Sequence, residues 1–197
     1  MSADALVALL VFAFVSSITP GPSNFMLLAS GANFGFRRTL PQLFGIAAGF
    51  GALLLAVGLG LGALLAAAPA LHLVLKLAAA AWLLSLAWRL GSSRSMGREG
   101  AVAKPLTFRE AASFQWINPK AWIAAGSAMA VYASAEAPFV SALLVAAVFA
   151  LAILPSLAAW AGFGVALRDW LSEPARLRWF NVVMGLLLAA TLVPMLW

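Results

Sequence analysis

The sequence predicts an all-α integral membrane protein whose six transmembrane helices form two inverted three-helix repeats, with proline-broken first and fourth helices. Of its 197 residues, 64% are hydrophobic and 9% are charged, and the mean hydropathy is +1.03. Soluble globular domains are about 25% charged, so this composition belongs to a membrane protein. Two polar clusters that contain proline, Thr19–Asn24 and Asn118–Lys120, occupy matching places in the two halves of the chain.

Six apolar stretches account for most of the chain. A helix needs roughly 20 apolar residues to cross a bilayer, and suitable stretches lie near residues 5 to 30, 40 to 65, 70 to 90, 111 to 133, 139 to 166 and 178 to 197. The first stretch is expected to be an uncleaved helix, because residues 1–5 carry no positive charge and one acid, Asp4. The chain then divides into a first three-helix repeat (1–90), a cytoplasmic linker (91–107) and a second three-helix repeat (108–197).

Basic residues fall at alternate connections of this topology. Ten of the twelve do so: Arg37, Arg38, Arg89, Arg94, Arg98, Lys104, Arg109, Arg168, Arg176 and Arg178. By the positive-inside rule these connections are cytoplasmic, which places both termini outside. This bias also explains the net charge of +6, so no nucleic-acid partner is expected.

The two proline clusters predict interrupted helices at similar depth in the membrane. Backbone N–H and C=O groups freed by proline persist in hydrocarbon only where protein or a water-filled cavity satisfies them. A single proline within a span is more often a simple kink. Two breaks at corresponding positions of inverted halves instead indicate a solute site between the repeats.

The residues at the breaks suit a small zwitterion. Each half-helix that restarts after proline directs free N–H groups toward a bound anion such as a carboxylate. Ser23 and Asn24 add donors, and the Lys120 ammonium could neutralise the same carboxylate. Freed carbonyls, with the side-chain oxygens of Asn24 and Asn118, could accept from an amine. Alternatively, Asn24, Asn118 and Lys120 satisfy one another and lock the broken helices together, and the two roles are compatible.

At these residues the chain resembles the lysine-exporter-like (LysE/RhtB) family of bacterial amino-acid exporters, over essentially its full length. The similarity is carried by Thr19-Pro20-Gly21-Pro22-Ser23-Asn24 and by Asn118-Pro119-Lys120-Ala121. The segments 103–108 and 114–117 look closest to the cysteine and O-acetylserine exporter branch. Many members carry proline-glutamine-phenylalanine after the second motif, where this chain has residues 128–132, Ala-Met-Ala-Val-Tyr, so the substrate stays open.

The resemblance implies a multi-pass secondary transporter of the bacterial inner membrane that exports amino acids or related metabolites by alternating access, driven by the proton-motive force. The expected substrate-binding residues are Thr19, Pro20, Gly21, Pro22, Ser23, Asn24, Gln115, Asn118, Pro119 and Lys120. Its expected partners are an amino-acid substrate, protons and the lipid bilayer, with no cofactor and no metal.

Proton coupling has few candidates, because all six acidic residues fall at termini, in loops or at span ends. Lys120 is a candidate, since burial favours the neutral form of an amine. Lys76 and His72, near the outer end of the third span, are candidates too, although an interfacial side chain that reaches toward water is the more ordinary reading of both. The amine of the substrate could also carry the proton.

Other function classes fit the sequence less well. An enzyme is not expected, because there is no HExxH or GxSxG motif and only one histidine. Efflux of a metal ion would call for buried carboxylates, thiolates or several imidazoles within the spans. A non-transporting structural subunit remains an alternative, but it would not need paired breaks. Small-xxx-small glycine pairs at 45 and 49 and at 58 and 62 favour close helix approach within the fold, and leave a homodimer open.

Overall fold

The computed structural model describes residues 1–62, 67, 69–93, 104–134 and 136–193. Within this part of the chain the structure consists of eight α-helices with no strand, which confirms the predicted all-α class. Most of the linker, the last four residues, and the side chain of His72 lie outside the described part of the chain.

The helix bounds follow local sequence signals closely. The elements are α1 (Ala3–Ile18), α2 (Pro22–Phe34), α3 (Phe36–Ala56) with the π-turn η1 (Val57–Leu61), α5 (Pro69–Gly91), α6 (Phe108–Gln115), α7 (Pro119–Tyr132), α8 (Pro138–Ala166), the 3-10 turn η2 (Trp170–Ser172) and α9 (Pro174–Ala190). Five α-helices begin at proline, whose fixed φ and missing N–H suit the first helical position. At α6, Thr107 and Glu110 form a reciprocal capping box.

Both predicted helix breaks are present. Helices α1 and α2 meet at 58°, separated by Thr19, Pro20 and Gly21. Pro20 and Pro22 have no N–H to give to the carbonyls four residues earlier, so the α1 ladder ends there. In the second half, residues 116–118 separate α6 from α7.

Within the described part of the chain, three helical segments are individually long and apolar enough to cross a membrane, and the bent pair α1 and α2 would be a fourth if it forms one span. These three are Phe36–Leu61, Leu73–Gly91 and Pro138–Ala166. Helix α3 starts four residues before the predicted stretch at 40, because Gly35 reverses the chain with a φ of 81°. Helix α9 starts at Pro174 rather than 178, and its 17 residues are short for a span. The number of spans and the inverted arrangement therefore stay predictions.

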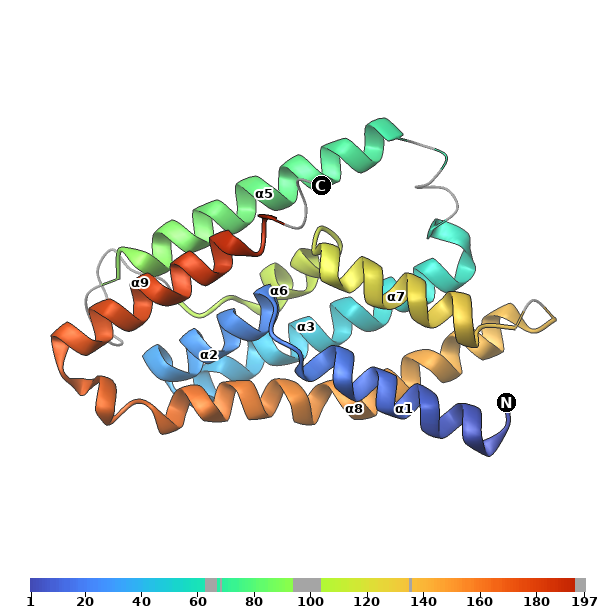
Figure 1. The fold of residues 1–197 in the computed structure, drawn as a ribbon, viewed down its shortest axis with the longest axis horizontal. Helices are drawn as coiled ribbons and strands as arrows, with labels where there is room; N and C mark the ends of the chain where they lie inside the picture. The colour runs from blue at the N-terminus through green and yellow to red at the C-terminus, as the bar shows by residue number, and fades with distance from the viewer. Residues whose placement is uncertain (63–66, 68, 94–103, 135, 194–197) are drawn as a thin grey trace.

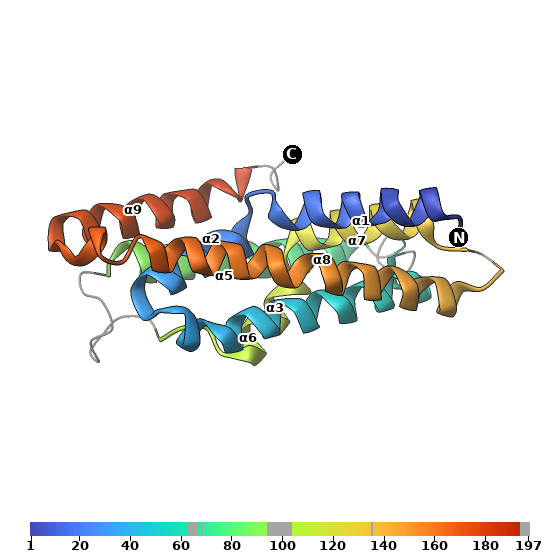
Figure 2. The ribbon, with the colours of Figure 1, turned by 90° about the horizontal axis from the view of Figure 1, so that it is seen from below.

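The helices lie lengthwise in one elongated body (Figure 1). The connections from α2 to α3 and from α8 to α9 and the C-terminal end of α5 face one end, and the N-terminus and the C-terminal end of α7 lie at the other (Figures 1 and 2). We call the first the basic end, because the helix ends and connections there carry these described bases: Arg37, Arg38, Arg89, Lys104, Arg109, Arg168, Arg176 and Arg178.

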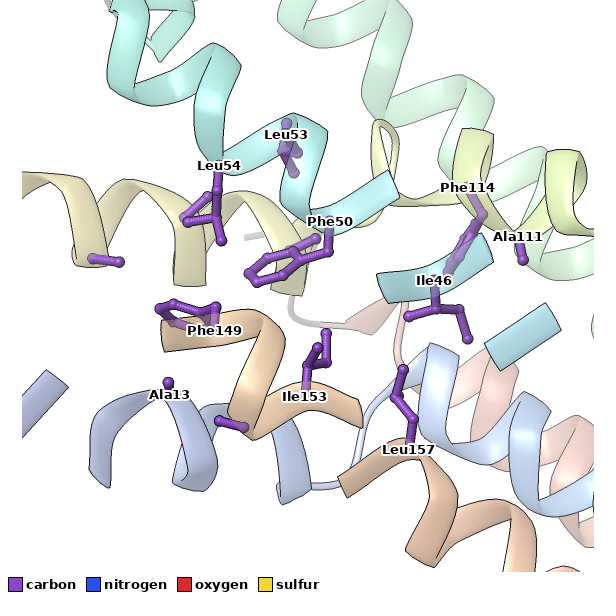
Figure 3. Close-up of a cluster of buried hydrophobic side chains, with 14 of the residues drawn as sticks. Ala13, Ile46, Phe50, Leu53, Leu54, Ala111, Phe114, Phe149, Ile153 and Leu157 are labelled. Atoms are coloured by element: carbon purple, nitrogen blue, oxygen red, sulfur yellow. The ribbon is translucent and has the colours of Figure 1, made fainter. Parts of the chain in front are cut away.

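Helices α3 and α8 form the centre of the packing. Helices α1 and α2 pack on α8, α6 and α7 pack on α3, and α5 pairs with α9. Between α3 and α8, the rings of Phe50 and Phe149 meet edge-on with centroids 5.3 Å apart (Figure 3). The two broken helices are thus each held against a long central helix.

Glycine sets how closely these helices approach. A Cβ at Gly45 or Gly49 of α3 would lie 2.3 or 2.4 Å from a carbonyl oxygen of α6. This confirms close helix approach within the fold for that predicted pair. Helices α2 and α8 approach in the same way, because a Cβ at Gly31 or Gly164 would lie 2.1 Å from a carbonyl oxygen of the other helix.

Candidate functional site

The two helix breaks meet at a central cavity. Its empty volume, counting the open mouth, is about 430 Å³. Six of the ten predicted site residues line it: Gly21, Ser23, Asn24, Gln115, Asn118 and Lys120. Residues about 100 positions apart in the sequence therefore share one cavity.

Side chains satisfy the carbonyls freed at the end of α1. Asn24 Nδ2 donates to the carbonyl oxygens of Ser17 at 2.9 Å and Thr19 at 2.8 Å. Trp160 of α8 donates its indole N–H to the Ile18 carbonyl at 3.0 Å. The Lys120 ammonium, from the second break, donates to the Thr19 carbonyl. The carbonyls at the first break therefore accept hydrogen bonds from α2, from α8 and from the second break.

A buried polar network joins the breaks a second time. Asn118 caps α7, its Oδ1 accepting from the Lys120 N–H at 3.2 Å, and its Nδ2 donates to Ser23 Oγ at 3.3 Å. Gln115 Nε2 donates to the same hydroxyl at 3.2 Å. Ser23, Gln115 and Asn118 are all buried. Buried polar groups that satisfy one another in this way fix the relative position of the two helices.

The start of α2 differs from the start of α7. No described side chain caps α2, whereas the Asn118 side chain caps α7. The first intrahelical bond of α2 runs from the Phe25 N–H to the Gly21 carbonyl, which leaves the N–H groups of Ser23 and Asn24 without a helical partner. Free N–H groups and the positive end of a helix dipole favour a negatively charged group beside the cavity.

Apart from two serines at the end of α1, the rest of the cavity wall is apolar. It includes Ile46 and Phe50 of α3 and Phe149, Ile153 and Leu157 of α8, and Figure 3 shows these side chains between the two helices. Mostly apolar walls with a few convergent polar groups are typical of small-molecule sites.

The comparisons with known proteins agree with this geometry. Residues 14–193 match the LysE type translocator family. The chain belongs to this family. The family is described as one of translocators, and the long apolar helices agree with a membrane protein.

Curated relatives of this LysE translocator are named cysteine/O-acetylserine efflux proteins. Those of Escherichia coli strain K12 and Shigella flexneri serotype 5b are each 32% identical to it over 121 residues. The chain spans 61% of the length of these relatives, and the match covers 61% of the chain itself. No solved structure matches the chain significantly.

Four of the ten predicted residues do not line the cavity. The side chains of Thr19 and Pro20 are exposed, and Thr19 contributes its carbonyl. Pro22 and Pro119 begin α2 and α7. The alternative in which Asn24, Asn118 and Lys120 pair with one another is only partly realised, because Asn24 bonds to α1 carbonyls and not to the second break.

Of the predicted proton carriers, Lys120 lines the cavity and Lys76 does not. Lys76 is half-buried on α5, and His72 lies on the same helix with its side chain outside the described part.

Sequence reasoning missed three polar contributors: Trp160, Ser16 and Ser17. Ser16 and Ser17 line the cavity from the end of α1, next to the predicted motif. Trp160 reaches the break from 142 residues away, and no local pattern marks it.

Proposed function

We propose that this translocator exports amino acids or closely related small metabolites across the bacterial inner membrane, as a secondary transporter that works by alternating access and is driven by the proton-motive force. The observation that carries the proposal is the meeting of the two helix breaks at one cavity, with Lys120 of one break donating to the Thr19 carbonyl of the other. Broken helices that meet between repeats are the usual place for a transporter to bind its solute.

A zwitterionic solute matches the groups around the cavity. Its carboxylate would accept from the uncapped N–H groups of α2 and from Lys120, whose ammonium would move from the neutral Thr19 carbonyl to a charged acceptor. A carboxylate acceptor adds the attraction between opposite charges to the hydrogen bond that the ammonium donates, which favours this exchange. Its amine would donate to side-chain oxygens of Gln115 and Asn118, both of which line the cavity.

The packing supports two inverted repeats. In the first half, the broken pair α1 and α2 packs on α8 of the second half, and in the second half α6 and α7 pack on α3 of the first. Helices α3 and α8 pair with each other, as do α5 and α9. This exchange of partners is what a two-fold axis between three-span halves would produce. With the basic end cytoplasmic, both termini would lie outside.

Proton coupling is assigned to the cavity itself. Lys120 is the predicted carrier that lines the cavity, and a substrate carboxylate bound there would change the charge around its ammonium. Binding of solute and proton at one residue would couple the two movements.

The names of the curated relatives suggest which solutes to test first. Cysteine and O-acetylserine are small polar amino acids, and the relatives named for their efflux share 32% identity with this chain over 121 residues. We infer a solute of that size and polarity.

Counterflow with purified protein in proteoliposomes tests the proposal. The panel holds labelled cysteine, O-acetylserine, homoserine, leucine and lysine, with empty liposomes as the background. Accumulation of at least one small polar amino acid above background, increased by a proton gradient, is the expected result. A protein that is folded and inserted yet exchanges no amino acid would contradict export, and transport indifferent to the gradient would contradict proton coupling alone.

A further inference from the structure

A second cavity lies between the helix breaks and the basic end. Its empty volume, counting the open mouth, is about 530 Å³. The polar part of its lining comes from Ser30, Asn33, Gln42, Arg89 and Lys104, and from Ser93, which follows α5. The other lining residues are apolar and come mainly from α2, from α5 and from residues 105–106 ahead of α6, with Leu188 from α9.

Gln42 is the unsatisfied polar group of this cavity. Its side chain is 1% exposed, and its Nε2 has no hydrogen-bond partner among the described residues. Neighbouring polar side chains do have partners: Asn33 Nδ2 donates to the Asn181 Oδ1 at 3.0 Å, and the hydroxyls of Ser30 and Thr39 lie 2.9 Å apart. Leaving a buried donor unpaired costs its full desolvation, so a ligand acceptor at Gln42 would recover that free energy.

The charge at the mouth of the cavity is positive. Arg89, in the last turn of α5, and Lys104, ahead of α6, are both exposed on its rim. Among the described residues, no acid lines the cavity and neither cation forms a salt bridge. A cationic rim with a donor at the base and apolar walls between them suits a small solute that carries a carboxylate.

The two cavities follow one another along the same helices. On α3, Gln42 lines the second cavity and Ile46, one turn further on, lines the central one. On α2, Met26 lines the second cavity and Ser23 the central one. Residues three or four apart share a helix face, so the cavities are neighbours on the way from the basic end to the breaks.

We propose that the second cavity is a loading site, which takes the carboxylate of the solute at Arg89, Lys104 and Gln42 before the solute reaches the central cavity. This inference rests on the proposed export function, and it adds a site outside the two broken helices. A solute that enters from the basic end would therefore meet these residues first, and they would set its apparent affinity on that side.

Uptake of labelled O-acetylserine by inside-out membrane vesicles, which present the cytoplasmic face outward, tests the rim. Combining Arg89→Gln with Lys104→Gln should raise KM roughly tenfold, the size expected for losing a charge-assisted hydrogen bond. The maximal rate and the KM in right-side-out vesicles should stay unchanged. The matched control combines Arg109→Gln with Arg178→Gln, which removes the same charge from the same end at residues that do not line the cavity.

Gln42→Met tests the base of the cavity. Methionine keeps the length of the side chain and removes the unpaired donor, so the variant should raise KM in inside-out vesicles while its Tm in detergent, without solute, stays equal or rises. A purely structural glutamine would instead lower Tm and affect uptake from both faces.

Each outcome bears on a different statement. If the rim variant and its control have the same KM, the loading site is wrong and export stands. If the wild-type protein takes up no O-acetylserine and no other amino acid, export and the loading site both fall. The rim effect should persist in proteoliposomes of phosphatidylcholine alone. An effect that appears only when phosphatidylglycerol is present would mean that an anionic lipid headgroup occupies the cavity, which overturns the proposal.

Discussion

At the scale of single residues, Lys120 is a group whose removal can separate binding from folding. The Thr19 carbonyl that accepts from Lys120 also accepts from Asn24 at 2.8 Å. Losing the ammonium therefore leaves no backbone group unpaired at the first break. The contact keeps a charge beside the cavity, and we expect the fold not to depend on it.

Lys120→Met should abolish counterflow of zwitterionic amino acids while changing the Tm in detergent by no more than a few degrees. Methionine keeps the apolar stem and removes the charge. Lys120→Arg keeps the charge in a different shape and should retain partial binding. Thermal shifts caused by added solute, measured beside counterflow, check both. A methionine variant that binds amino acids normally would remove Lys120 from the site.

In contrast to Lys120→Met, Asn24→Ala should lower both stability and transport. Of Asn24 and Lys120, only Asn24 donates to both the Ser17 and the Thr19 carbonyls. Its loss should therefore destabilise the protein by about 1 to 3 kcal/mol as well as impair transport. Denaturation in detergent gives the stability change. Equal stability of the alanine variant and the wild-type protein would show that other groups close the first break.

Because Gly21 has no side chain, the Lys120 side chain can lie against it. A Cβ at Gly21 would lie 2.7 Å from Lys120 Cδ and 3.1 Å from its Nζ. Gly21 has extended backbone that alanine can adopt, and the end of a lysine side chain moves easily. Gly21→Ala should therefore displace the ammonium and reduce counterflow at least several-fold with little change in Tm. A variant with normal transport would show that the ammonium works equally well from another position.

At the scale of helices, two long central helices hold the two broken ones through glycine contacts. The approach of α2 to α8 depends on Gly31 and Gly164, and that of α3 to α6 depends on Gly45 and Gly49. In each case the obstacle to a larger residue is the backbone of the facing helix, which cannot rotate away. The position of each break relative to the cavity is thus set by small residues far from the motif.

Two glycines of α8 allow a matched test. A Cβ at Gly164 would lie 2.1 Å from the Leu28 carbonyl oxygen, whereas one at Gly162 meets nothing within 4 Å. Gly164→Ala should cost about 1 to 3 kcal/mol through overpacking. Gly162→Ala should be neutral, or stabilise by up to about 1 kcal/mol through helix propensity. Thermal denaturation of both variants in the same detergent measures the difference, and similar Tm values would contradict the close contact.

At the scale of the whole molecule, composition and proline placement predicted more than any single residue did. The all-helical class, both breaks and the helix starts at proline follow from local rules that act within a few residues. Contacts between distant residues were less predictable. Trp160 donates to the Ile18 carbonyl across 142 positions, and Gln42 is left without a partner only because of how the helices pack. Membership of the family was recognisable from the motifs, while the side chains that close the cavity depend on tertiary contacts.

The number of spans is the largest prediction that the fold leaves to experiment. Six spans would place the connection between α7 and α8 on the same side as the N-terminus, and the connection between α8 and α9 on the opposite side. If only the four apolar segments cross, namely the bent pair α1 and α2 with α3, α5 and α8, both of these connections change sides. Exposed positions in each region are Ser2, Glu136 and Ser172.

Single cysteines at these three positions distinguish the topologies, because the chain contains no cysteine that would give a background. With a membrane-impermeant maleimide on intact cells, we expect Ser2→Cys and Glu136→Cys to react, and Ser172→Cys to react only after permeabilisation, since the basic end is retained in the cytoplasm. A denatured sample of each variant controls for the reactivity of its thiol. The reverse result for positions 136 and 172, with Ser2→Cys still labelled, would mean four spans. In that case the end of α7 and the connection from α2 to α3, which lie at opposite ends of the helices (Figures 1 and 2), would share one side of the membrane, so that result would contradict both the lengthwise packing and the inverted repeat.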